Sequence, residues 1–208
     1  MPLIWSEFNA SYANHQEITD SIYMGPWLAD TISQCDGMTQ MMSYWTFSDV
    51  FEEQGVKQSP FYGGFGIVAE DGIPKPAYNA FKLLHMLGEE RLPTTVKDVL
   101  ATRRKDGTVV IAAWNLVEPG AEGPEKTIDL NVQGAAADAH ATIYRVDATH
   151  GDTLDAWKRM GSPQYPTQQQ VAALRKAAET GPPQIERMHG NRITITVPPM
   201  GLAVIEIR

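Results

Sequence analysis

The chain has 208 residues, one cysteine and a formal net charge of -8. Hydrophobic residues make up 43% of it and aromatic residues 9%, so a sizeable core can be buried, which argues against a disordered chain. The single cysteine excludes an internal disulfide framework and a multi-cysteine metal site, and the excess of 25 acidic over 17 basic residues argues against a nucleic-acid surface.

The first part of the chain alternates strand-like and helix-like patterns. The apolar, β-prone residues from Leu3 to Phe8 predict a short strand. A helix is expected to follow up to about Cys35 and to begin at Pro26, because proline is favoured at the first helical position. The apolar side chains expected on its buried face are Trp27, Leu28 and Ile32.

A second strand is expected from Met38 to Phe47, and its apolar residues on both faces suit a covered parallel strand. A long loop from Ser48 to Ile73 follows, in which Gly63-Gly64-Phe65-Gly66 permits a tight turn. The next helix is predicted with Pro76 near its start and Gly88 as its C-terminal stop. Its apolar residues at helical spacing are Tyr78, Phe81, Leu84 and Leu87. This β-α-β-α order is typical of a parallel α/β fold.

The second part of the chain predicts a β-sandwich, because short strands alternate with turn residues. One helix is expected there, opened by a capping box of Thr167 and Gln170. Lys105-Asp106-Gly107 is a hairpin turn signal between two of the strands. The strands are expected at Val96 to Arg103, Thr108 to Leu116, Thr127 to Val132, Ala141 to Val146, Arg192 to Val197 and Leu202 to Ile207. The predicted domains are residues 1–92 and residues 93–208.

Glu7 is the first candidate for chemistry. It stands at the carboxyl end of the first predicted parallel strand, and such strand ends carry the chemistry in barrels of alternating strands and helices. A carboxylate at this place can act as a nucleophile, a general base or a metal ligand. A glutamate held by hydrogen bonds for structural reasons is the equally open alternative.

A second cluster lies at the end of the second predicted strand and in the loop after it, so both clusters are expected on one face of the fold. It contains Trp45, Glu52 and Glu53. Aromatic rings stack on the apolar face of a sugar while carboxylates accept hydrogen bonds from its hydroxyls, so this combination suits a polyhydroxylated ligand. The alternative is that Trp45 is a core residue and the two glutamates are ordinary loop charges, and the pairing with Glu7 weakens it.

Other classes of site lack their signatures. The glycine-rich segment has no Lys-Ser/Thr ending and does not predict a phosphate loop, and no serine or cysteine nucleophile motif occurs. The five histidines show no metal-ligand spacing, so neither a metal nor a cofactor is expected. No apolar run approaches the roughly 18–20 residues of a membrane span. With no signal peptide visible, the sequence predicts a cytoplasmic protein without a membrane partner.

Several motifs identify a resemblance that covers nearly the whole chain. They are Ser6-Glu7-Phe8-Asn9-Ala10-Ser11-Tyr12, Ser43-Tyr44-Trp45-Thr46-Phe47-Ser48-Asp49-Val50-Phe51-Glu52-Glu53, Phe61-Tyr62-Gly63-Gly64-Phe65-Gly66, Ile73-Pro74-Lys75-Pro76, Thr102-Arg103-Arg104, Ala113-Trp114-Asn115 and Gly161-Ser162-Pro163-Gln164-Tyr165-Pro166. With these motifs the chain resembles glycoside hydrolase family 39, which contains bacterial β-xylosidases and α-L-iduronidases. The bacterial β-xylosidases are the closer match.

The resemblance implies a catalytic (β/α)8 TIM barrel followed by a β-sandwich, and a retaining double-displacement mechanism on β-xylosides or xylo-oligosaccharides. It places the nucleophile on Glu7 and the sugar-binding residues on Asn9, Trp45, Glu52 and Glu53. It also makes the first two predicted strands the seventh and eighth of the barrel. The chain is therefore expected to be the C-terminal portion of such an enzyme, with the N-terminal barrel strands absent.

One expected group is missing from the sequence. The family's acid/base glutamate lies in an Asn-Glu-Pro motif, and no such motif occurs in these 208 residues. A retaining glycosidase needs two carboxyl groups roughly 5–5.5 Å apart, so the chain alone is expected to cleave terminal β-linked xylose poorly or not at all. The alternative is a non-catalytic remnant whose β-sandwich is structural or binds carbohydrate. Further copies of the chain in a homo-oligomer, or a separate N-terminal segment, are the partners that would complete the barrel.

Overall fold

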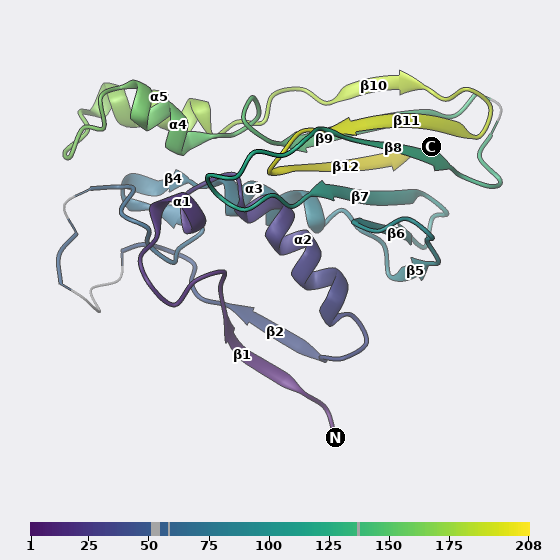
Figure 1. The fold of residues 1–208 in the computed structure, drawn as a ribbon, viewed down its shortest axis with the longest axis horizontal. Coiled ribbons are helices and arrows are strands. Elements are labelled where there is room, and N and C mark those ends of the chain that lie inside the picture. The colour runs from purple at the N-terminus through teal and green to yellow at the C-terminus, as the bar shows by residue number, and fades with distance from the viewer. Residues whose placement is uncertain (51–54, 58, 137) are drawn as a thin grey trace.

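The structure is a computed structural model that describes residues 1–50, 55–57, 59–136 and 138–208. Its first part contains two parallel neighbouring strands, with the helices between and after them (Figure 1). The elements are β1 (Ile4–Phe8), α1 (Gln16–Thr19), α2 (Met24–Cys35), β2 (Met41–Tyr44), β3 (Val68–Ala69), the 3-10 turn η1 (Glu70–Gly72), β4 (Ile73–Pro74) and α3 (Pro76–Leu84). The predicted β-α-β-α order is confirmed, with short additional elements.

Several boundaries in this part were predicted wrongly. The helix expected to begin at Pro26 begins at Met24, because the first N–H groups of a helix have no intrahelical partner and a proline in the first turn therefore costs little. The strand expected to reach Phe47 ends at Tyr44. From that point the backbone pairs with a different segment, since Thr46 N–H donates to the Phe65 carbonyl and Val68 N–H donates to that of Phe47.

The third helix, α3, begins at Pro76 as predicted but ends at Leu84, four residues before Gly88. Gly88 instead lies against β6, where a Cβ atom would stand 2.2 Å from the carbonyl oxygen of Arg103, so the glycine permits a close approach rather than stopping the helix. The predicted apolar stripe is also wrong at Tyr78, which is exposed. The residues that α3 buries in the core include Ala77, Ala80, Leu83 and Leu84.

The second part consists of a six-stranded antiparallel sheet, a two-stranded antiparallel sheet and two helices. The sheets have the strand orders β10-β9-β12-β7-β6-β5 and β11-β8. The elements are β5 (Glu90–Leu92), β6 (Val99–Arg103), β7 (Val109–Asn115), β8 (Lys126–Asn131), β9 (His140–Val146), α4 (Thr153–Arg159), α5 (Gln168–Ala177), β10 (Gln184–Arg187), β11 (Arg192–Val197) and β12 (Gly201–Ile207). The six predicted strands are present, whereas β5, β10 and α4 were not predicted.

Local sequence signals account for the elements that were found. The capping box of α5 is present, with the Thr167 side chain accepting from the Gln170 N–H and the Gln170 side chain accepting from the Thr167 N–H. The predicted β6–β7 hairpin turns at Gly107, whose φ of 90° suits glycine. The missed helix α4 carries a comparable signal, because the Asp152 side chain caps it by accepting from the Asp155 N–H.

The long strand β12 explains how the parts pack together. It is buried on both faces: Ala203 and Ile205 face the core shared with β8 and β11, while Leu202 and Val204 join a cluster with α2 and α3. Figure 1 shows α2 between the β1–β2 pair and the six-stranded sheet. The predicted domain boundary between residues 92 and 93 remains a prediction. β5 lies just before this boundary, and it pairs with β6, which lies after it.

Candidate active site

The carboxyl ends of β1 and β2 border an open hollow of about 640 Å³. Three of the predicted site residues, Glu7, Asn9 and Trp45, lie in its lining together. The lining residues are Trp5, Glu7, Phe8, Asn9, Ala10, Ser11, Tyr12, Trp27, Thr31, Trp45 and Phe65. The other two predicted residues, Glu52 and Glu53, lie outside the described residues.

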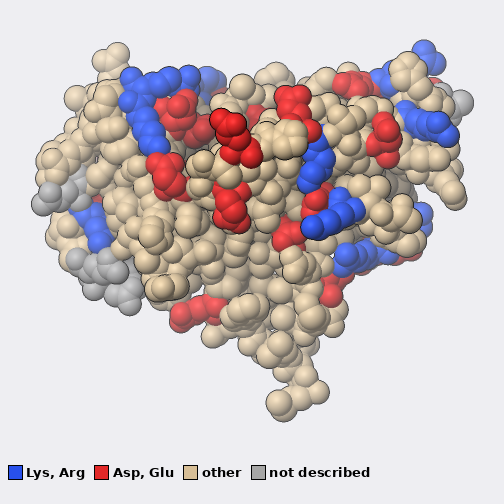
Figure 2. All heavy atoms as spheres, in the orientation of Figure 1, with Lys and Arg blue, Asp and Glu red and all other residues tan. Residues whose placement is uncertain are grey.

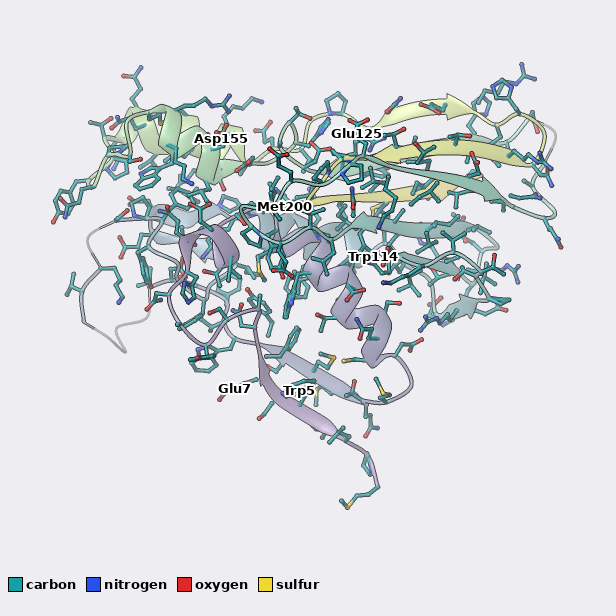
Figure 3. All side chains as sticks on the ribbon, in the orientation of Figure 1. Trp5, Glu7, Trp114, Glu125, Asp155 and Met200 are labelled. Carbon is teal, nitrogen blue, oxygen red and sulfur yellow. The ribbon has the colours of Figure 1, made fainter. Side chains whose placement is uncertain are left out.

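Glu7 is exposed on β1, next to an irregularity in the pairing with β2. Trp5 pairs with Met42 and Phe8 with Tyr44, so two residues of β1 stand opposite one residue of β2. Such a bulge bends a strand and re-aims the side chains beside it. Figure 3 shows Glu7 and Trp5 beside β1, well separated in this view from Glu125 and Asp155.

Asn9 follows β1 and connects three segments of the hollow. Its side-chain amide donates to the carbonyl oxygens of Trp45 and Phe65, the latter at 3.1 Å, and its Oδ1 accepts from the Ala10 N–H at 2.7 Å. The peptide bond between Trp45 and Thr46 is cis. Asn9 therefore holds the main chain of Trp45 and Phe65 together at the hollow.

An aromatic cluster supports the hollow from the side of the helices. The Phe8 ring stacks with that of Trp27 at a centroid distance of 6.1 Å and meets the Tyr44 ring edge-on at 5.5 Å. Tyr44 in turn packs edge-on against Phe81 of α3 at 5.2 Å. Burial raises the pKa of the Tyr44 phenol above its ordinary range, so this ring is a neutral packing group. Glu7 and Trp45 are the chain neighbours of Phe8 and Tyr44, so this packing fixes the backbone beside both of them.

A buried charge cluster that the sequence reading did not identify lies close behind the hollow. The Lys75 ammonium is 2.6 Å from Asp20 Oδ1 and 2.9 Å from Asp49 Oδ2, and all three side chains are fully buried. Lys75 Nζ also donates to the Gly64 carbonyl at 2.8 Å. Asp49 and Lys75 both belong to the motifs of the resemblance, and that was the available signal for them.

The cluster holds two carboxylates for one ammonium, and burial dominates their titration. Desolvation raises the pKa of Asp20 to about 6, against the opposing attraction of Lys75. Desolvation also raises the pKa of Asp49, again opposed by Lys75. One proton shared between the two carboxyls at mildly acid pH would leave the cluster neutral.

The glycines of residues 63–66 pack closely against this cluster, and two of them donate hydrogen bonds to its carboxylates. The N–H of Gly66 donates to Asp49 Oδ1 at 2.6 Å, and that of Gly63 donates to Asp20 Oδ2 at 2.6 Å. A Cβ on Gly64 would lie 2.3 Å from Asp49 Oδ1, and one on Gly66 would lie 2.4 Å from the Asp49 backbone nitrogen. The segment expected to form a tight turn therefore presses its backbone onto buried carboxylates.

Two other kinds of site are absent from the part of the chain that the structure describes. It contains no group of three or more His, Cys, Asp or Glu side chains placed to hold a metal ion. Nor does it contain a helix long and apolar enough to cross a bilayer.

Comparison with known proteins identifies a family. The family described as Glycosyl hydrolases family 39 matches residues 1–193. A beta-xylosidase from Geobacillus stearothermophilus is 36% identical over 177 residues, which cover 85% of this chain and 35% of that protein. A beta-xylosidase from Caldicellulosiruptor saccharolyticus is 28% identical over an alignment of 218 residues, covering 100% of this chain and 45% of that protein.

Solved structures agree with these relatives. The crystal structure of a monomeric beta-xylosidase from Caulobacter crescentus CB15 superposes with a TM-score of 0.87 at 26% identity, covering 100% of this chain and 45% of that one. The GH39 enzyme from Xanthomonas axonopodis pv. citri gives a TM-score of 0.83 at 26% identity, covering 100% of this chain and 44% of that one. The chain thus spans less than half the length of these relatives, a coverage that fits the C-terminal portion of such a protein.

Proposed function

Because this chain belongs to family 39 of the glycosyl hydrolases, we propose that it is the nucleophile-bearing portion of a retaining β-xylosidase. The observation that carries the proposal is the hollow at the carboxyl ends of two parallel strands, where Glu7, Asn9 and Trp45 lie together. The beta-xylosidases among the relatives support terminal β-linked xylose as the sugar that this hollow receives.

The proposed chemistry is a double displacement. The Glu7 carboxylate attacks C1 of the xylose, and the bond from C1 to the leaving oxygen breaks as that oxygen takes a proton from an acid. Water then hydrolyses the ester between Glu7 and the sugar, which retains the anomeric configuration. Glu7 is exposed at the hollow and can reach a bound sugar, while the Trp45 ring offers an apolar face for stacking.

The acid of this reaction is assigned to another part of the enzyme. Glu7 is the one carboxylic acid among the described residues that line the hollow. The mechanism needs a second carboxyl about 5–5.5 Å away, which the family resemblance places in an Asn-Glu-Pro motif that this sequence lacks. General acid catalysis contributes roughly 10²–10⁴-fold, so this chain by itself should be slow on substrates with poor leaving groups.

The proposal extends to the fold. β1, α2, β2 and α3 would be the last two strand–helix units of a (β/α)8 barrel, and the antiparallel sheets would be its β-sandwich neighbour. Parallel sheets are ordinarily covered on both faces, yet Ile4, Trp5 and Met41 are 54%, 48% and 56% exposed. Figure 2 shows the projecting end of β1 without charged side chains on this face. Further barrel strands would pair with this edge and cover it.

The test is hydrolysis of 2,4-dinitrophenyl β-xyloside, whose leaving group departs without a protonating acid. The chain should release dinitrophenol, Glu7→Gln should not, and Glu17→Gln, which alters an exposed glutamate on α1, should behave as the parent. Release that survives Glu7→Gln would contradict the assignment of the nucleophile. No release, together with xylan binding by calorimetry, would favour a carbohydrate-binding remnant instead.

A further inference from the structure

Lys75 occupies an unusual position for a lysine. It is fully buried, and it stands directly before the first residue of α3. Burying an ammonium group is costly unless it is paired and hydrogen-bonded, and Lys75 has two carboxylates and a carbonyl oxygen as partners. Buried ion pairs are weak evidence for stability, since apolar residues of similar volume often stabilise a fold as well. The arrangement therefore suggests that the charges fix one particular geometry.

The geometry that Lys75 fixes includes the wall of the hollow. Lys75 binds the Gly64 carbonyl directly and binds Gly66 through Asp49, whose Oδ1 accepts from the Gly66 N–H. Phe65 lies between these two glycines and lines the hollow. Both neighbours of Phe65 are thus anchored to the same buried ammonium.

Hydrogen bonds connect Phe65 to Asn9 and to the segment that begins at Trp45. Its carbonyl oxygen accepts from the Thr46 N–H at 2.9 Å and from the Asn9 side-chain amide at 3.1 Å. Asn9 also binds the Trp45 carbonyl. On the other side, the Asp49 N–H donates to the Val68 carbonyl at 2.9 Å, so residues 45–49 are held against residues 65–68 at both ends.

We propose that Lys75 and Asp49 are positioning residues for Trp45 and Asn9. Their ion pair locks the Gly64–Gly66 segment against residues 46–49 and so sets the place of the Trp45 ring at the hollow. The sugar-binding role of that ring rests on the proposed function, but its position does not. Neither Lys75 nor Asp49 lines the hollow, and both act through Phe65 and the main chain.

The test is fluorine NMR of the whole chain labelled with 5-fluorotryptophan, without any sugar. Each of the five tryptophans then carries one fluorine, and the signal that Trp45→Phe removes is that of Trp45. Lys75→Met should shift or broaden that signal by more than its linewidth, while the buried Trp114 and Trp157 report an intact fold. The matched control is Lys82→Met, which removes an exposed lysine from α3, the helix that follows Lys75, and should leave the Trp45 signal in place.

If Lys75→Met does not fold, a second pair of variants tests the positioning role. Asp49→Asn and Asp20→Asn have the same volume change and each leaves Lys75 one carboxylate. Asp49→Asn should move the Trp45 signal, whereas Asp20→Asn should leave it near its original place, because only Asp49 lies on the segment that continues from Trp45. Equal effects of the two variants, or an unmoved Trp45 signal in a folded Lys75→Met or Asp49→Asn chain, would overturn the proposal.

The outcome is separable from the enzymatic proposal. A chain that releases no dinitrophenol can still show the Trp45 shift, in which case the positioning role stands and the β-xylosidase assignment does not. A chain that is active but keeps its Trp45 signal in both variants would refute the positioning role alone.

Discussion

The buried carboxyl of Asp20 should make the stability of the fold depend on pH. Its pKa is raised from 3.8 to about 6, with burial as the leading cause. Between these pH values the folded chain retains a proton that the unfolded chain has released. The stabilisation is therefore fully present below pH 3.8 and is lost as the pH rises through about 6.

The size of the effect follows from the shift. A pKa difference of this magnitude corresponds to about 3 kcal/mol of unfolding free energy. Asp49 shifts in the same direction, and other carboxyls such as that of Asp147 shift in the opposite direction, so the parent chain alone does not isolate Asp20. Asp20→Asn does isolate it, because asparagine resembles the protonated acid and cannot ionise.

The assay is urea unfolding of the parent chain and Asp20→Asn at four pH values from about 4 to 7. As the pH rises across this range, the unfolding free energy of the variant should increase by about 3 kcal/mol relative to that of the parent. Most of this increase should occur below pH 6. If the difference in unfolding free energy did not change with pH, or if the variant became less stable relative to the parent as the pH rises, Lys75 would keep Asp20 ionised throughout. The attraction of Lys75 would then outweigh desolvation in setting the pKa of Asp20.

Three further outcomes are expected. Gly66→Ala should destabilise the fold by roughly 1–3 kcal/mol in chemical unfolding, since its Cβ would lie 2.4 Å from the Asp49 nitrogen, while Gly25→Ala, whose nearest neighbour is at 3.4 Å, should be near neutral. Thr167→Ala should cost about 1 kcal/mol by removing the cap of α5, and an unchanged unfolding midpoint would contradict that role. The chain should associate with rising concentration in light scattering, and Ile4→Lys should reduce the apparent mass where Val96→Lys, also at an exposed residue, does not. A monomer at every concentration would remove the self-association.

Local sequence signals predicted the elements whose causes are local. The α5 cap needs only Thr167 and Gln170, and the β6–β7 turn needs only Asp106 and Gly107, so both could be placed from a few neighbouring residues. The end of β2 could not be placed in this way. At Thr46 the backbone stops pairing with the β1 segment and pairs with Phe65, and no local pattern indicates that partner.

The residues of the site also fall into those that local signals predicted and those that they did not. Glu7, Asn9 and Trp45 lie at or just after the carboxyl ends of predicted strands, and strand ends of a parallel sheet meet at one edge, so their meeting was predictable. The Lys75 cluster was missed because its members come from distant parts of the chain: Asp49 lies 26 residues from Lys75. A charged residue in a sequence is ordinarily read as exposed, and only the packed fold shows that these three are buried.

The central claim is that Glu7 is the nucleophile of a β-xylosidase site, and covalent trapping tests it most directly. 2-Deoxy-2-fluoro-β-xylosyl fluoride carries a leaving group that needs no acid, and its fluorine slows hydrolysis of the glycosyl-enzyme ester. Mass spectrometry should find one fluoroxylosyl group on the chain, peptide mapping should place it on Glu7, and Glu7→Gln should remain unlabelled. A label on Glu52, Glu53 or any other residue, with Glu7 unmodified, would contradict the account.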